Sequence, residues 1–277
     1  MLLNRSIRNF PALKLLKRLY RMLGFNPMEG LQNLAGLPRF VSEFRAYNRM
    51  NQRVSLTAQL RFMFPILSER KASAGTIGGA YFHQDLWAAR RIFRKRPSIH
   101  VDIGSRIDGF VAHILTFMDI TLIDIRSVES NLKGLTFVQD DATLLKTIAN
   151  DSVESLSSLH VAEHFGLGRY GDPIDPEACF TFMDSLQRIL SPGGTLYFSV
   201  PIGMERVEFN AHRVFSPSTI LRAFPLLEVR SFSFVGEDGC IYEDSDPSQV
   251  PPSLYSCGLF ELMKPLKRFE GSLDDFR

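Results

Sequence analysis

Cysteine and long apolar runs are both scarce in this 277-residue sequence. The three cysteines, Cys179, Cys240 and Cys257, lie far apart, so they form neither a disulfide framework nor a paired zinc motif. We therefore expect a reducing, cytoplasmic compartment. No apolar run approaches the roughly 20 residues that span a bilayer, and the N-terminus lacks the apolar core of a signal peptide. Neither a transmembrane nor an exported protein is expected.

A charge excess of one sign is also missing, because 32 Lys and Arg face 30 Asp and Glu. No overall field points to nucleic acid, and the loops lack the interleaved aromatic and basic residues that stack on bases. The acidic cluster near the C-terminus is typical of a solvated loop, so we expect no metal. These absences favour a small-molecule substrate.

Apolar residues are plentiful, at 45% of the sequence with 23 Phe, which is enough for one α/β domain with an appendage. We predict an N-terminal helical extension over residues 1–75 and a catalytic domain over residues 76–277. Residues 1–24 predict a basic amphipathic helix. Such a helix packs on its own domain or on a second copy in a homo-oligomer, or it contacts the inner face of the membrane peripherally.

From Ile99 onward, short β-branched runs alternate with helical stretches, which predicts a mostly parallel sheet flanked by helices. The expected strands are 99–103, 120–125, 135–138, 154–159, 195–200, 227–235 and 255–263. The expected helices are 108–118, 175–190 and 216–224, with an earlier one starting near Tyr81.

Acidic residues and glycines follow three of these strands. HVDIGSRIDGF places Asp102 and Gly104 at a strand end, where ligands approach the backbone of open α/β sheets. Asp124 ends the next strand and is placed to accept hydrogen bonds from ribose hydroxyls, while Asp140 and Asp141 in VQDDAT suit an adenine amine. Because GxGxxG is absent, this pattern favours an adenosyl group over a dinucleotide.

These segments, VDIGS, LIDIR and QDDAT, together with SLHVAEHF, LSPGGTLYFSVP and CGLFELMK, resemble the successive motifs of class I methyltransferases. More narrowly, YFHQDLWAAR, HVDIGSRIDGFVAH, EHFGLGRYGDPIDP and FNAHRVFSP resemble the domain-of-unknown-function family number 268, which is grouped with those enzymes. The resemblance implies a Rossmann-like fold with a mostly parallel seven-stranded sheet, helices on both faces and S-adenosylmethionine as cofactor.

The resemblance also assigns the cofactor contacts. Asp102 and Gly104 would lie on the methionine side, Asp124 at the ribose, and Asp141 with Ala142 at the adenine edge. The complete predicted set is Asp102, Gly104, Ser105, Gly109, Asp124, Asp141, Ala142 and His160. The usual D-x-G-x-G-x-G is altered, because Arg106 replaces the middle glycine, where it either crowds the site or reaches an anionic group.

The loop HVAEHFGLGRYGDPIDP supplies candidate chemistry after the fourth main strand. Transfer of a methyl group to a hydroxyl requires a base, and histidine titrates in the right range. We predict His164 as base with Glu163 as its orienter, and His212 as a rival base. The candidate substrate contacts are Arg169, Tyr170, Asp172, Asn210 and Arg213. Alternatively, His160 and His164 cap the strand, and Arg213 pairs with a carboxylate structurally.

Together these patterns predict a methyltransferase that acts on a small polar acceptor, with a cell-surface carbohydrate or its precursor as the favoured class. Two alternatives stay open, because a fold does not establish a function. One is a catalytically inactive Rossmann-type module that binds a partner. The other is a different enzyme that uses the histidine-rich loop on a sugar phosphate.

Overall fold

The computed structural model describes residues 27–67, 77 and 79–266. The chain divides into two units, Met1–Thr76 and Ile77–Arg277. The amphipathic helix predicted over residues 1–24 lies outside the described residues.

The first unit is built on helix α3 (Pro27–Met50), which two short 3-10 turns follow, η2 (Val54–Leu56) and η3 (Leu60–Phe62). The side chain of Asn48 ties the returning segment to the helix. Its Nδ2 donates to the Ala58 carbonyl oxygen at 2.9 Å, and its Oδ1 accepts from the Ala58 amide at 2.9 Å. Among the described residues, no helix combines the length and apolarity that crossing a membrane requires.

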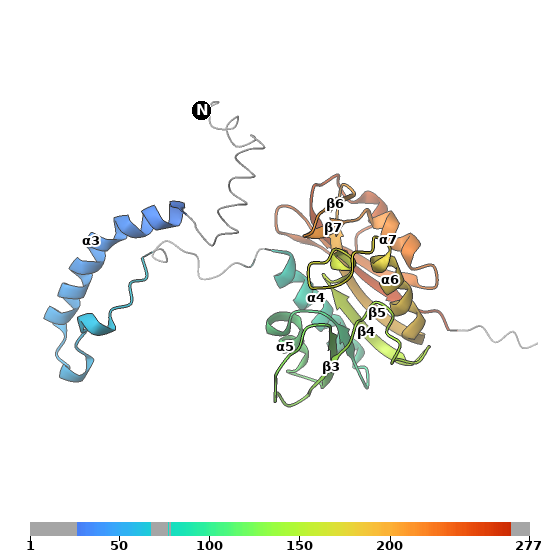
Figure 1. The fold of residues 1–277 in the computed structure, drawn as a ribbon, viewed down its shortest axis with the longest axis horizontal. Coiled ribbons are helices and arrows are strands. Elements are labelled where there is room, and N and C mark those ends of the chain that lie inside the picture. The colour runs from blue at the N-terminus through green and yellow to red at the C-terminus, as the bar shows by residue number, and fades with distance from the viewer. Residues whose placement is uncertain (1–26, 68–76, 78, 267–277) are drawn as a thin grey trace, which may run out of the picture. The chain divides into compact units, whose positions relative to one another are not determined.

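The second unit contains an eight-stranded sheet in the order β3-β2-β1-β4-β5-β10-β8-β9. Strands β3, β4 and β5 of this sheet are labelled in Figure 1. Strands β1 to β5 pair in parallel, whereas β10 pairs antiparallel with both β5 and β8. The strands are β1 (Val101–Ile103), β2 (Ile120–Asp124), β3 (Leu135–Gln139), β4 (Val153–Leu159), β5 (Leu190–Ile202), β8 (Glu228–Val235), β9 (Ile241–Tyr242) and β10 (Ser256–Met263).

The predicted Rossmann-like sheet is therefore confirmed, and all seven expected strands form within it. The expected total of seven was one too few, because the two-residue β9 pairs with the end of β8. A separate hairpin of β6 (Arg206–Glu208) and β7 (His212–Val214) was not predicted. Each of its strands has three residues, too short to show the alternation that marks a strand.

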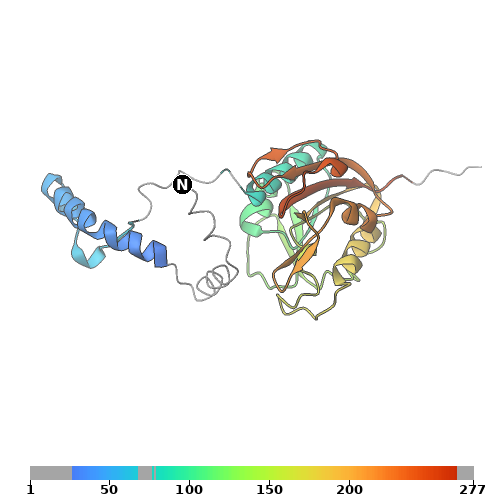
Figure 2. The same ribbon diagram turned by 90° about the horizontal axis from the view of Figure 1, so that it is seen from above.

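Helices cover both faces of the sheet (Figure 2). On one face lie α4 (Ala80–Lys95) and the segment 107–114, with Ile92 and Phe110 fully buried. On the other face lie α6 (Ala178–Ile189) and α7 (Pro217–Ala223), with Phe182 and Ile220 fully buried. The helix predicted over 108–118 is shorter, with a π-helical turn (Ile107–Val111) running into α5 (Ala112–Ile114).

Parallel pairing decides where the functional residues meet. Asp102 of β1 stands opposite Leu122 of β2 and Ser157 of β4. The carboxyl ends of β1, β2 and β4 therefore lie along one edge of the sheet, where open α/β sheets bind ligands. Strand β10 runs in the opposite direction, so its first residues reach the same edge.

Candidate active site at the carboxyl edge of the sheet

Two adjoining pockets open at this edge. The strand-end pocket has a volume of about 100 Å³ and a mainly apolar lining. It is lined by Ile103, Gly104, Ile123, Asp124, Ile125, Arg126, Asp141, Ala142, Thr143, His160, Val161, His164, Phe165, Tyr170 and Asp172. The polar pocket has a volume of about 350 Å³ and is lined by Tyr81, Gly104, Arg106, Arg126, Leu159, His160, Glu163, His164, Arg169, Tyr170, His212 and Tyr255.

Five residues line both pockets, which makes them neighbouring compartments of one site. They are Gly104, Arg126, His160, His164 and Tyr170. The strand-end pocket has the buried carboxylate and apolar walls that suit a nucleoside, whereas the polar pocket gathers guanidinium, imidazole and phenol groups.

Gly104 forms the turn between the pockets and has a φ of +70°. A Cβ atom there would lie 2.9 Å from Cγ1 of Val161, so glycine is required both by conformation and by space. The side chain of Asp102 stabilises this turn through hydrogen bonds. Its carboxylate accepts from the Ser105 amide at 2.9 Å, from the Ser105 hydroxyl at 2.7 Å and from the Ser157 hydroxyl.

Asp102 and Ser105 were expected among the cofactor contacts, but both are buried and line neither pocket. Burial raises the pKa of Asp102 to about 6, and its hydrogen bonds are made to Ser105 in the turn and to Ser157 in β4. In this structure they shape the backbone around Gly104. Gly109 also lies outside both pockets, and its Cα faces α4, where a Cβ atom would collide with the carboxylate of Asp85.

Asp124 ends β2 and is 8% exposed in the wall of the strand-end pocket. Its carboxylate is already engaged by Arg126. The Arg126 amide and Nε donate to Oδ1 at 2.8 and 2.9 Å, and Nη2 donates to Oδ2 at 2.5 Å. Asp141 and Ala142 line the same pocket from the segment after β3, with Asp141 holding its turn through the Thr143 amide and hydroxyl.

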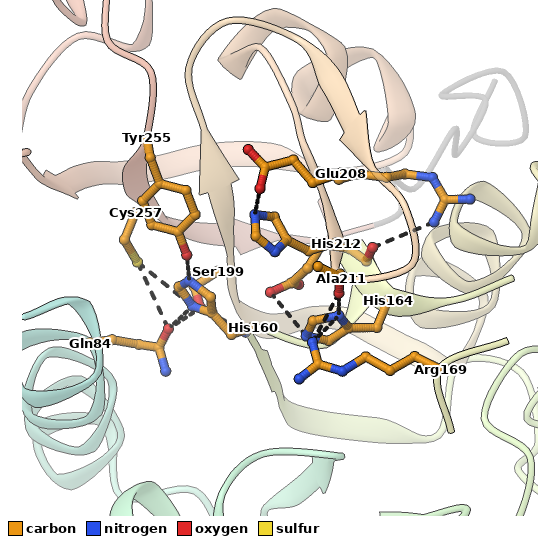
Figure 3. A network of polar contacts seen from close by, with 12 residues as sticks. Gln84, His160, His164, Arg169, Ser199, Glu208, Ala211, His212, Tyr255 and Cys257 are labelled. Carbon is orange, nitrogen blue, oxygen red and sulfur yellow. Dashed lines mark hydrogen bonds and ion pairs between the residues drawn. The ribbon is translucent and has the colours of Figure 1, made fainter. Parts of the chain in front are cut away.

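His160 stands between the two pockets in a left-handed backbone conformation, with a φ of +56°. Its Nδ1 is paired with Oε1 of Gln84, which also accepts from the Ser199 hydroxyl at 2.6 Å (Figure 3). Because Gln84 Oε1 is an acceptor, Nδ1 carries the proton and Nε2 faces the Tyr255 hydroxyl at 3.4 Å. Burial lowers the pKa of His160 to about 3, so the ring is neutral.

His164 and Glu163 lie side by side in the polar pocket. The His164 Nδ1 donates to the Ala211 carbonyl oxygen at 2.7 Å, which leaves Nε2 with a free lone pair (Figure 3). Oε1 of Glu163 lies 3.7 Å from that Nε2, and the buried Oε2 has no hydrogen-bond partner among the described residues. Burial lowers the pKa of His164 to about 4 and raises that of Glu163 to about 8.

This geometry changes the role that we expected for Glu163 beside His164. An orienter would hold the ring nitrogen opposite the basic one, and that position is taken by the Ala211 carbonyl. Glu163 instead faces Nε2 itself, with its Oε1 3.7 Å from that nitrogen. Its carboxyl group is therefore placed beside the nitrogen that can take up a proton.

The predicted substrate contacts Arg169, Tyr170 and Asp172 come from the loop after β4, and all three line a pocket. Arg169 donates to the Ala211 carbonyl at 2.9 Å and stacks on the Tyr170 ring. Asp172 accepts from the amides of Gly168 and Tyr170, so it organises the loop that presents the other two.

The hairpin β6–β7 contributes one of its three candidates. His212 lines the polar pocket, with Nε2 3.8 Å from Oε2 of Glu208 and its ring 5.6 Å from that of Tyr255. Asn210 is exposed and lines neither pocket. Arg213 is 7% exposed and also lies outside both pockets.

The expected substrate role of Arg213 does not agree with its position, and its partners are main-chain carbonyls instead of a carboxylate. Nη1 donates to the carbonyl oxygen of Phe165 at 2.5 Å and Nη2 to that of Pro176 at 3.3 Å. Arg213 thus holds the loop after β4 in place.

Arg213→Met is therefore expected to lower the free energy of unfolding by about 2 kcal/mol or more, because it removes a buried guanidinium that holds two partly buried carbonyls of the loop. Arg169→Met is the matched control, since its exposed guanidinium makes one carbonyl bond, and its expected loss is below about 1 kcal/mol. Urea denaturation measures both. Equal losses in the two variants would contradict the structural role of Arg213.

Sequence reasoning did not select Arg126 and Tyr255 as site residues. An arginine two residues after a strand-end acid can fold back onto it, and that spacing was visible in LIDIR. Tyr255 precedes β10, and its position became predictable only once β10 was known to run antiparallel. Arg106 lines the polar pocket, stacked on the Tyr81 ring, so it does not crowd the strand-end pocket.

Comparison with protein families supports the narrower of the two resemblances. Residues 109–234 match the family DUF268. Its model is described as a Caenorhabditis protein of unknown function. The DUF268 match begins at Gly109 and ends within β8, so it includes the loop after β4 and the hairpin β6–β7. No curated protein matches the chain.

Several solved structures are similar in fold. The [4+2]-cyclase SpnF is 12% identical, with 66% of this chain and 82% of that chain covered and a TM-score of 0.47. The Burkholderia thailandensis 1,6-didemethyltoxoflavin-N1-methyltransferase, solved with bound 1,6-didemethyltoxoflavin and S-adenosylhomocysteine, is 13% identical, with 66% of this chain and 78% of that chain covered and a TM-score of 0.46. The N-methyltransferase NodS from Bradyrhizobium japonicum WM9, in complex with S-adenosylhomocysteine, is 14% identical over 67% and 88%, with a TM-score of 0.47.

Proposed function

We propose that this protein is an S-adenosylmethionine-dependent methyltransferase whose cofactor binds in the strand-end pocket and whose acceptor binds in the polar pocket. The observation that carries the proposal is the junction of the two pockets. A buried strand-end carboxylate and apolar walls lie on one side, proton-accepting groups lie on the other, and Gly104, His160 and His164 line both.

The residues present fit an adenosyl cofactor. Asp124 brings a carboxylate to the wall of the pocket, where ribose hydroxyls would replace the Arg126 side chain as its partners, and Asp141 with Ala142 would form the adenine edge. Gly104 lines both pockets and has no side chain, so a ligand can approach its backbone closely. When bound, S-adenosylmethionine supplies an electrophilic methyl group, so the protein must position the acceptor and remove its proton.

His164 and Glu163 perform the proton transfer in this proposal. Nε2 of His164 accepts the proton of the acceptor, and the Glu163 carboxylate, 3.7 Å away, stabilises the resulting imidazolium. The Ala211 carbonyl holds the ring so that Nε2 keeps facing Glu163. His160 stays neutral and positions the Tyr255 hydroxyl through its own Nε2.

A small polar acceptor suits the polar pocket, and a hydroxyl of a carbohydrate or its precursor is the favoured class. Tyr81, Tyr170 and Tyr255 offer ring faces and hydroxyls, and the arginines and histidines offer hydrogen bonds. This combination of aromatic surface and polar groups matches the alternating apolar and hydroxyl surfaces of a sugar.

Calorimetric titration with S-adenosylmethionine and S-adenosylhomocysteine tests the cofactor. We expect micromolar binding, weakened ten-fold or more by Asp124→Ala, which corresponds to about 1.4 kcal/mol. Asp108→Ala is the control, because Asp108 is an exposed acid that pairs with Arg106 and lines neither pocket.

Absence of binding to the wild-type protein would overturn the methyltransferase proposal. It would favour an inactive binding module, in which the Asp124–Arg126 pair closes the nucleoside site. Turnover of a sugar phosphate without S-adenosylmethionine would instead favour the alternative enzyme.

A further inference from the structure

The carboxylate of Asp124, which a ribose would need, is already bound by the side chain of Arg126. Oδ1 of Asp124 has two lone pairs, and the Arg126 amide and Nε use both. The amide is held there by the chain, two residues after Asp124. Two ribose hydroxyls can therefore bind both carboxylate oxygens only after the Arg126 side chain leaves Oδ1.

The Arg126 side chain can move away from Asp124 and still stay in the site. It is 55% exposed, and its guanidinium carbon lies 5.0 Å from the centre of the Tyr170 ring. Arg169 stacks on the same ring at 5.1 Å. Both arginines line the polar pocket, so a guanidinium freed from Asp124 stays beside Arg169.

Release of the Arg126 side chain from Asp124 changes how the charges around the polar pocket are paired. While Arg126 pairs with Asp124, its charge is compensated by the carboxylate. The hydrogen bond of Arg169 goes to a main-chain carbonyl, which carries no net charge. Arg106, the third arginine of the pocket, pairs with Asp108. Release of Arg126 therefore gives the pocket a second guanidinium whose charge is not compensated by such a pair, and two adjacent arginines form a bidentate site for a carboxylate or a phosphate.

We propose that the acceptor carries an oxyanion group, held by Arg126 and Arg169, and that Arg126 becomes available for it when Asp124 exchanges the guanidinium for the ribose hydroxyls of the cofactor. This inference rests on the proposed function. It makes binding ordered, with the cofactor first and the anionic acceptor second, and by linkage each ligand strengthens the binding of the other.

Calorimetry on the full chain tests the exchange. S-adenosylhomocysteine and 5′-methylthioadenosine, which has the ribose but no amino-acid carboxylate, are titrated into the wild type and Arg126→Met. We expect the variant to bind both nucleosides about five-fold more tightly, because no side chain at position 126 competes for Asp124. Arg230→Met is the control and should leave both affinities unchanged, since it removes a similarly exposed guanidinium, paired with Glu228, outside both pockets.

The acceptor half is tested with inorganic phosphate at constant ionic strength, titrated with and without saturating S-adenosylhomocysteine. We expect the nucleoside to tighten phosphate binding about ten-fold in the wild type and to have no effect in Arg126→Met. Arg169→Met should weaken phosphate binding in both conditions. If S-adenosylhomocysteine leaves the affinity of the wild type for phosphate unchanged, this half of the proposal is overturned.

Two nucleoside results would overturn the exchange. Weaker binding of S-adenosylhomocysteine but not of 5′-methylthioadenosine to Arg126→Met would show that Arg126 binds the carboxylate of the cofactor. Unchanged binding of both would show that Arg126 and ribose do not compete. Failure of the wild type to bind either nucleoside would be a different outcome, because it rejects the proposed function itself and with it the exchange.

Discussion

His164→Ala is expected to lower kcat by about 100-fold or more, the usual contribution of a general base, while S-adenosylhomocysteine affinity changes by less than about three-fold. The imidazole Nε2 is the neutral, unprotonated nitrogen that faces the polar pocket, and the variant leaves Asp124 and Gly104 in place. The rate of S-adenosylhomocysteine release with an acceptor found by screening, together with calorimetry, provides the two readouts.

His113→Ala is the matched control for this experiment. The Nδ1 of His113 also pairs with a main-chain carbonyl, that of Gly109, at 2.7 Å, but its ring is exposed outside both pockets. Turnover should be unchanged in this variant. If His164→Ala keeps full turnover and His212→Ala loses it, the base is His212, whose Nε2 lies in the same pocket 3.8 Å from Oε2 of Glu208.

Glu163→Gln is expected to lower turnover about ten-fold or more and to remove a pH dependence of stability. The pKa of Glu163 rises from an ordinary 4.5 to about 8 because the carboxyl group is buried. The folded protein therefore keeps a proton that the unfolded chain has lost between these two pH values. The stability associated with this proton is complete below pH 4.5 and is lost as the pH rises through 8.

The interval from pH 7 to 8 isolates this effect from the buried histidines. Burial lowers the pKa values of His100 and His160 to about 3 and that of His164 to about 4. Their contributions change below the unfolded value of 6.5 and have the opposite sign. Between pH 7 and 8 the wild type should lose about 1 kcal/mol, or about 2–4 °C in Tm, that Glu163→Gln does not lose.

Turnover should follow the opposite trend with pH. The ionised Glu163 carboxylate is the form that stabilises the imidazolium, so kcat is expected to rise toward pH 8 in the wild type. The rise should be absent from the Glu163→Gln profile. If the free energies of unfolding of the wild type and of Glu163→Gln change in parallel from pH 7 to 8, Glu163 is not protonated in the folded protein.

The elements of the sheet and the family resemblance were determined by the sequence itself. Strand periodicity and strand-end acids are local patterns, so all seven main strands and the position of Asp124 at the end of β2 could be predicted from residues close together in the chain. The same applies to the loop after β4, whose density of histidine, arginine and acid marked it before any contact was known.

The tertiary structure decided which of these residues face a ligand. Asp102 and Arg213 have side chains that could bind a ligand. Their hydrogen bonds are made instead to other parts of the protein, such as Ser105 for Asp102 and the main-chain carbonyl of Phe165 for Arg213. Arg126 and Tyr255 enter the site because one folds back onto Asp124 and the other precedes the antiparallel strand β10. Side-chain direction and strand orientation depend on contacts between distant segments, and sequence periodicity carries no information about those contacts.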